Sequence, residues 1–143
     1  MSSANKLIVR RKMYELISSG NLVVLDEVFD EEVVSSDPSE PEPIHGREAY
    51  RASVEDVLAA FPRRHLRIDD QISEGDRVVT RWTFTGRHEG ELLGIPATGV
   101  DVEFAGIDIH RIRNGRIVEE WSSWDTLGLM RQLGALPEMG PVA

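Results

Sequence analysis

Carboxylates and tryptophans gather in the run Val118–Asp125, whose sequence is VEEWSSWD. A carboxylate beside indole rings loses water, and this desolvation makes it a stronger base. Carboxylates in such surroundings are often functional, so Asp125 is a candidate for the general base of a proton transfer. The same aspartate, standing before Thr126–Gly128, also suits the N-cap of a short helix. Both interpretations of Asp125 are open at this point.

The segment 78–88 alternates in the manner of a strand, and one of its two faces is the more apolar. That face carries Trp82, Phe84 and finally His88, so we expect it to point inward. His88 is then either a catalytic group or a histidine whose hydrogen bonds are satisfied at a strand end.

A second segment, 100–112, places Asp108 on one face with Phe104 and His110. A carboxylate beside aromatic residues is unusual, so Asp108 is a candidate acid or base. It could equally lie at an edge or bond to a neighbouring strand. His110 could line a pocket beside it, but the arginines at 111 and 113 favour a place near an exposed hairpin.

The large aromatic side chains predict an apolar enclosure for a ligand. We expect Trp82, Phe84, Phe104 and Trp121 to form its walls, with Trp124 at the end of the last strand. Cavities of this kind are where small molecules bind. The two last tryptophans could also belong to the core.

Other kinds of chemistry lack their motifs. The glycines at 86, 90, 94 and 99 are too widely spaced for a phosphate-binding loop, and no GxSxG elbow is present. The histidines are scattered without metal-ligand spacing, and the chain has no cysteine. We therefore expect neither a metal ion nor an organic cofactor, which leaves acid–base chemistry or simple binding.

Composition narrows the partners and the location. The 143 residues suit one domain with a core and a pocket. Acids outnumber bases 25 to 16, and the net charge of −9 argues against nucleic acid or an anionic membrane as partner. The sequence has no apolar run of signal-peptide or membrane-span length, so we expect a cytoplasmic protein.

Helices precede strands along the chain. Apolar spacing predicts helices at 5–18, at about 22–29 and at 47–61, with a polar loop at 35–43. β-Branched and aromatic stretches predict strands at 65–72, 78–88, 100–112 and 116–124, followed by a short helix within 126–136. Asn114-Gly115 is a strong hairpin signal between the last two strands.

This order predicts an α+β domain. A long, curved antiparallel sheet needs one face covered, and the N-terminal helices are the available cover. A sheet curled around helices in this way forms a cone that encloses an apolar pocket.

Several motifs spread along the chain share one resemblance. They are Tyr14 in the opening helix, the Phe61-Pro62 junction, Thr85–Gly90 (TGRHEG), Leu93–Gly99 (LGIPATG), Gly106–Ile112 (GIDIHRI), Asn114–Trp121 (NGRIVEEW), and Trp124-Asp125 with Leu129–Leu136 (LMRQLGAL). Together they resemble the SnoaL-like polyketide cyclases over nearly the whole chain, so we expect residues 1–143 to form a single SnoaL-like domain.

The resemblance implies the cone-shaped fold of nuclear transport factor 2, a homodimer, and acid–base catalysis without a cofactor. In the cyclases an aspartate at the end of the last long strand removes a proton next to carbonyl groups, and the enolate closes a ring by intramolecular aldol addition. By motif that residue is Asp125, and His88, Tyr14 and Trp124 would line the pocket. The chain departs from some cyclases at Asp108, where they carry a histidine.

The expected function is ring closure of an apolar or polycyclic, polyketide-like small molecule. Asp125 would be the base, and His88 or Asp108 would stabilise the developing oxyanion. Alternatives with the same fold are a hydroxylase, an epoxide hydrolase, or a module that binds small molecules without catalysis.

Overall fold

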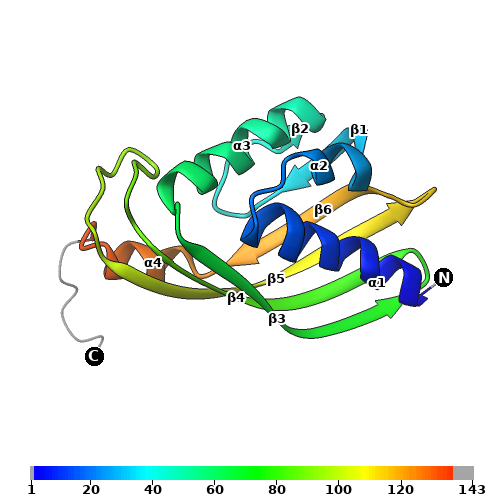
Figure 1. Ribbon diagram of the computed structural model, residues 1–143. Helices are drawn as coiled ribbons and strands as arrows, with labels where there is room; N and C mark the ends of the chain where they lie inside the picture. The colour runs from blue at the N-terminus through cyan, green and yellow to red at the C-terminus, as the bar shows by residue number, and fades with distance from the viewer. Residues whose placement is uncertain (1, 137–143) are drawn as a thin grey trace.

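The computed structural model describes residues 2–136, in which helices lie along one face of a curved sheet (Figure 1). Its elements are α1 (Ser2–Arg10), the π-helix η1 (Arg11–Ser18), α2 (Val23–Val28), β1 (Phe29–Ser36), β2 (Ile44–His45), α3 (Arg47–Ala60), β3 (Arg64–Glu74), β4 (Arg77–Arg87), β5 (Asp101–Arg113), β6 (Arg116–Trp124) and α4 (Thr126–Gln132). Within the described residues, no helix combines the length and apolarity that crossing a membrane requires.

The six strands form one sheet in the order β2-β1-β6-β5-β4-β3. All neighbours are antiparallel except β1 and β6, which run parallel. Register shifts interrupt the β3–β4 and β5–β6 pairings. Such bulges bend a strand and increase its twist, which helps this sheet to curl toward the helices.

The turn between β5 and β6 fixes which residues face each other across these two strands. Asn114 and Gly115 both have positive φ, 52° and 75°, as a two-residue hairpin of type I′ requires, and this confirms the predicted hairpin. The register places Asp108 opposite Ser122 and His110 opposite Glu120. Four polar side chains are thereby brought together on two adjacent strands.

The predicted inward faces of β4 and β5 are confirmed. Val78, Trp82 and Phe84 are buried on β4, and Asp108 and His110 are buried on β5. Residues of the opposite parity, such as those at 81, 103 and 107, are exposed. The predicted α+β class with a curved sheet around N-terminal helices is confirmed as well.

The core lies between the helices and the concave face of the sheet. Figure 1 shows α1, α2 and α3 on this side, while α4 lies at the end of the sheet where β6 finishes. Fully buried side chains come from each layer, among them Met13 and Leu16 of η1, Leu25 of α2 and Ile117 of β6. The convex face of the sheet carries no helix in the described part of the chain (Figure 1).

Two elements differ from the sequence prediction. The segment Phe29–Ser36 is a strand, whereas its first residue was expected to end a helix and its last two to belong to a loop. Acidic residues at 30–32 hide the alternation, which becomes regular only from Val33 onward. The predicted helix at 5–18 forms, but its second half is a π-helix, a rare form that is often found at functional sites.

Candidate active site

A cavity of about 450 Å³ opens between the helices and the concave face of the sheet. This volume lies within the range of small-molecule sites. Side chains of η1, β1, α3, β4, β5 and β6 line it, together with the loop after β1. The enclosure has an aromatic wall and a charged floor.

The aromatic wall consists of four side chains in mutual contact. Phe84 and Phe104 stack with ring centroids 4.8 Å apart, and Trp82 and Trp124 flank Phe104 at 6.0 and 5.2 Å. All four line the cavity, as the sequence predicted. The absence of a side chain at Gly106 leaves room for the Trp82 ring, because a Cβ at this position would lie 2.4 Å from it.

The floor belongs to a largely buried polar cluster, whose members all line the cavity except His110: Lys12, Ser35, Tyr50, Asp108, His110, Glu120 and Ser122. Glu120 is its centre: Oε1 accepts a hydrogen bond from Ser35 Oγ at 2.7 Å, and Oε2 accepts one from Tyr50 OH at 3.0 Å. Oε2 also lies 2.7 Å from Lys12 Nζ and 2.7 Å from His110 Nε2. Four donors therefore surround one carboxylate.

Lys12 joins the two carboxylates of the polar cluster. Its ammonium lies 2.7 Å from Glu120 Oε2 and 3.1 Å from Asp108 Oδ2. The side chain is only 6 % exposed, and it reaches the floor from the buried face of η1. A buried lysine is tolerated when charged and hydrogen-bonded partners compensate its lost hydration.

These contacts fix the charge state of the floor. Burial alone opposes ionisation, but Lys12 and His110 hold the pKa of Glu120 well below its ordinary 4.5. Burial likewise disfavours the charged form of Lys12, yet Glu120 and the other anionic groups raise the pKa of Lys12 well above its ordinary 10.5. Burial and the charge of Glu120 also raise the pKa of Tyr50, so its phenol stays protonated and donates.

Asp108 differs from Glu120 in its surroundings. Ser122 Oγ donates to Oδ1 at 2.7 Å and Lys12 Nζ to Oδ2 at 3.1 Å. A carboxylate has about four acceptor positions, so Asp108 keeps lone pairs that these two donors do not use. It is 2 % exposed and lines the cavity, which makes it a buried base that faces the space a ligand would occupy.

Asp108, His110 and Glu120 offer ligand atoms within 4.8 Å of one another, a spacing that could hold a metal ion. Lys12 Nζ contacts all three, at 3.1, 3.2 and 2.7 Å. The Lys12 ammonium therefore occupies the position among these three side chains that a metal ion would take. Its positive charge compensates their negative charge without a metal ion.

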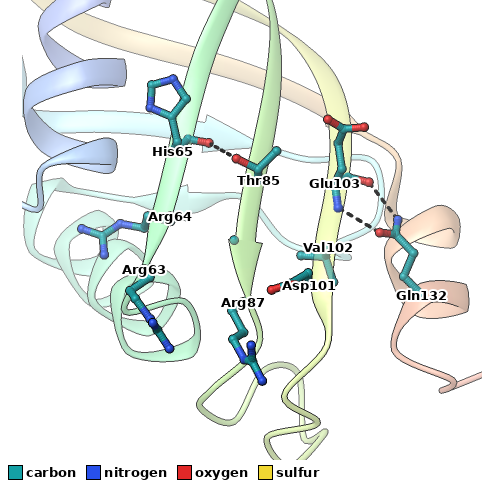
Figure 2. Close-up of a pocket in the computed structure, with 10 residues that line it drawn as sticks. Arg63, Arg64, His65, Thr85, Arg87, Asp101, Val102, Glu103 and Gln132 are labelled. Carbon is teal, nitrogen blue, oxygen red and sulfur yellow. Dashed lines mark hydrogen bonds between the residues drawn. The ribbon is translucent and has the colours of Figure 1, made fainter.

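A second hollow, of about 560 Å³, lies over the ends of β3, β4 and β5 (Figure 2). Its charged side chains are largely exposed, and Arg63 and Arg87 lie 2.6 and 3.6 Å from Glu89. Figure 2 shows the Gln132 amide bonded on both sides to the backbone of Glu103. Solvated and paired charges make poor acid–base groups, so the buried cavity is the candidate active site.

The expected placement of Asp125 beside desolvating tryptophans is wrong. Asp125 is exposed, does not line the cavity, and accepts a hydrogen bond from Gly128 N at 2.8 Å as the N-cap of α4. Alternation explains this position: Trp124 points inward, so the next residue points away. Of the two interpretations of Asp125, the N-cap agrees with the position of its side chain.

His88 and Tyr14 also lie outside the lining of the cavity. His88 is fully buried at the end of β4, where Nδ1 accepts from Thr98 N at 3.2 Å and lies 2.9 Å from Thr98 Oγ1. Tyr14 is 38 % exposed, and its hydroxyl accepts from Ile68 N at 3.1 Å. In the structure, the polar contacts of both residues are to β3 and to the loop after β4.

Trp121 was expected in the pocket wall, and this placement is wrong as well. Its ring lies about 6 Å from the guanidinium groups of Arg77 and Arg111, on the opposite face of the sheet from the cavity. A register shift after Arg111 lets Ile117 and then Glu120, Ser122 and Trp124 face inward. Residues 119, 121 and 123 therefore face outward.

His110 was expected either to line a pocket or to lie near an exposed hairpin, and both placements are wrong: it is fully buried in the polar cluster and does not line the cavity. The sequence interpretation missed Lys12 and Glu120 altogether. Lys12 had a signal, because it stands among Val9, Met13 and Leu16 on the apolar stripe of its helix. A charged residue on such a stripe needs a buried partner.

A cone-like sheet closed by helices over an apolar cavity defines the nuclear transport factor 2-like class of proteins, and the comparisons agree. A family model described as SnoaL-like polyketide cyclase matches residues 7–133, and the chain belongs to this family. The aklanonic acid methyl ester cyclase DnrD of Streptomyces peucetius is 34 % identical over 128 residues, which cover 87 % of each chain.

Solved structures extend the similarity. The structure of a SnoaL-like candidate polyketide cyclase from Jannaschia sp. CCS1 has a TM-score of 0.87 at 25 % identity, over 95 % of both chains. That of AclR, a candidate hydroxylase from Streptomyces galilaeus, has a TM-score of 0.84 at 25 % identity, over 98 % of this chain and 91 % of the other. The fold is thus shared by proteins with different assigned reactions.

Proposed function

We propose that the protein closes a ring in a polycyclic polyketide ester by intramolecular aldol addition, with Asp108 as the general base. The observation that carries this proposal is the position of Asp108, a buried carboxylate with unused lone pairs that faces an aromatic cavity. Membership of the cyclase family and the named reaction of DnrD support the substrate class.

In the proposed reaction, Asp108 takes a proton from the carbon between two carbonyl groups and leaves an enolate. The enolate carbon attacks a second carbonyl carbon of the same molecule, and a new carbon–carbon bond forms. The resulting alkoxide recovers the proton from Asp108, so that substrate and product are isomers. Asp108 serves first as base and then as acid.

The cavity contributes by holding the substrate in a folded shape. Intramolecular reactions are faster when the reacting groups are held in the correct orientation, and a flat aromatic wall suits a polycyclic ring system. Trp124 is held in place by a hydrogen bond from its Nε1 to Asp37 Oδ2 at 2.7 Å. This bond ties the loop after β1 to the wall of the cavity.

The reaction proposed here requires only proton transfers from the protein, and it calls for no metal ion or cofactor. We propose aklanonic acid methyl ester, the substrate named for the relative, as the first probe. Purified protein is expected to convert it to a product of the same mass, at the same rate before and after treatment with a chelator. Loss of activity on chelation, restored by a divalent ion, would contradict the mechanism.

A hydroxylase is the second candidate, because AclR shares the fold at 25 % identity. The same experiment separates the two when it is repeated with dioxygen and a two-electron reductant added, since hydroxylation then adds the mass of one oxygen atom and aldol closure adds none. A product heavier by oxygen would overturn the cyclase proposal, and so would recovery of unchanged ester.

A further inference from the structure

The polar cluster has one cation, Lys12, and two carboxylates, Glu120 and Asp108. The two carboxylates do not share the positive charge equally. Glu120 is surrounded by four donors and lies 2.7 Å from Lys12, so the ammonium and Glu120 form the closer ion pair. Asp108 receives two donors and lies 3.1 Å from the same ammonium. The unbalanced negative charge therefore falls on Asp108, next to the cavity.

His110 does not change this balance. Its Nε2 lies 2.7 Å from the ionised Glu120 and 3.2 Å from Lys12 Nζ, and the shorter contact to the carboxylate assigns a proton to Nε2, which donates to Glu120. Its Nδ1 is buried and has no hydrogen-bond partner, which is costly for an N–H and far less so for a lone pair. Hydrogen-bond geometry thus assigns a neutral imidazole, protonated at Nε2.

We propose that Lys12 is a positioning residue that keeps Asp108 ionised and ready to accept a proton, by separating its charge from that of Glu120. The proposal rests on the function proposed above. Without the ammonium, two buried carboxylates would face each other across a small space. Like charges at such a distance do not both ionise near neutral pH, so one of them takes up a proton. Asp108, with fewer donors, is the one that does.

Each element around the polar cluster contributes to the field at Asp108. The titratable or charged groups are Lys12 from η1, Tyr50 and Asp56 from α3, His110 from β5, Glu120 from β6, and Asp37, Glu40 and Glu42 from the loop after β1. The loop acids and Asp56 are the same in all the variants below. Differences between variants therefore report the charges of Lys12 and Glu120.

Three variants form a charge series: Lys12→Met, Glu120→Gln, and the double variant that carries both changes. Lys12→Met leaves two carboxylates without a cation, and Glu120→Gln leaves the ammonium to Asp108 alone. The double variant has the same net charge as the wild type. Met and Gln have lengths close to those of Lys and Glu, which limits changes in packing.

The test is the titration of Asp108, followed by NMR of protein labelled with ¹³C at the aspartate carboxyls and assigned with Asp108→Asn. We expect the midpoint to rise by about one pH unit or more in Lys12→Met and to fall in Glu120→Gln, since an opposite charge within a few ångströms shifts a carboxyl by about 1–3 units. The double variant should return close to the wild-type midpoint. A Lys12 that only packs would lower the melting temperature and leave the midpoint unchanged.

An unchanged midpoint in Lys12→Met would overturn the proposal, and so would a double variant displaced as far as Lys12→Met. If Lys12→Met does not fold, the comparison of Glu120→Gln with the double variant takes its place, and the added loss of the lysine must raise the midpoint. This experiment needs no substrate. The acid limb of the pH–activity profile with aklanonic acid methyl ester should shift in the same order, so a failure of the cyclase assay is distinguishable from a failure of the titration.

Discussion

Glu120 joins the helical layer to the sheet by hydrogen bonds. Ser35 comes from β1, Tyr50 from α3, Lys12 from η1 and His110 from β5, and all four contact the same carboxylate. A buried charge with this many donors is stabilised as the anion, whereas removal of its charge leaves donors without a partner. The floor of the cavity and the packing of the helices thus depend on one ionised residue.

This dependence predicts an acid-sensitive stability. The pKa of Glu120 is held below its ordinary 4.5, so its ionisation stabilises the fold fully above about pH 4.5. That contribution is lost as the pH falls below this value through the pKa of the folded state. We expect Glu120→Gln to cost about 1–3 kcal/mol at pH 7, because one buried charge-assisted acceptor is replaced by a neutral one.

Thermal unfolding of wild type and Glu120→Gln between about pH 7 and pH 3 measures this effect. The two melting temperatures should approach each other as the medium becomes acidic. A difference that stays constant over the whole range would show that the ionisation of Glu120 does not stabilise the fold.

Residue identities alone allowed only part of this site to be predicted. Alternation along β5 correctly placed Asp108 inward, because that strand is regular up to Arg111. On β6, Trp121 was expected in the wall because its side chain is large and aromatic, and no face was assigned from alternation. The register shift changes the parity between Ile117 and Glu120, so Glu120 faces inward and Trp121 outward.

At the scale of elements, turns and caps carry strong local signals, and the predicted hairpin and strands formed where expected. The β1 strand lacked such a signal, since its pairing with β6 depends on residues more than 80 positions later in the chain. The π-helical turns of η1 also have no simple sequence pattern. Yet this segment carries Lys12, so the missed geometry includes a residue central to the site.

The N-cap of α4 gives the prediction at this scale. Asp125→Ala should destabilise the protein by about 0.5–2 kcal/mol, because the N–H of Gly128 loses its acceptor, whereas Asp125→Asn should cost little. Melting temperatures of the two variants test this. Equal destabilisation by both changes would mean that the carboxylate charge, rather than capping, is what matters there.

At the scale of the whole molecule, the convex face of the sheet carries no helix in the described residues and is partly apolar. Ile107 is 50 % exposed there, with Val79 and Ile109 half-buried beside it. A sheet face of this kind is commonly covered by a second subunit, and closed pairs are the commonest assemblies. The homodimer expected from the sequence remains a prediction, for which this surface is the proposed interface.

Light scattering at micromolar concentration tests the assembly. We expect a mass of about twice the 16.0 kDa of one chain. Ile107→Lys should shift the population toward the monomer, since a charge would be buried in the proposed interface, while Arg113→Ala at the hairpin end should not. A monodisperse wild-type monomer would contradict the prediction.

The proposed mechanism depends most directly on which aspartate transfers the proton. Asp108 lines the cavity and Asp125 caps a helix in solvent, so their replacements by asparagine are a matched pair. With aklanonic acid methyl ester as substrate, we expect Asp108→Asn to lower kcat by about 10²–10⁴, the usual contribution of a general base, and Asp125→Asn to stay close to wild type. A fully active Asp108→Asn, or a loss of turnover confined to Asp125→Asn, would contradict the assignment of Asp108.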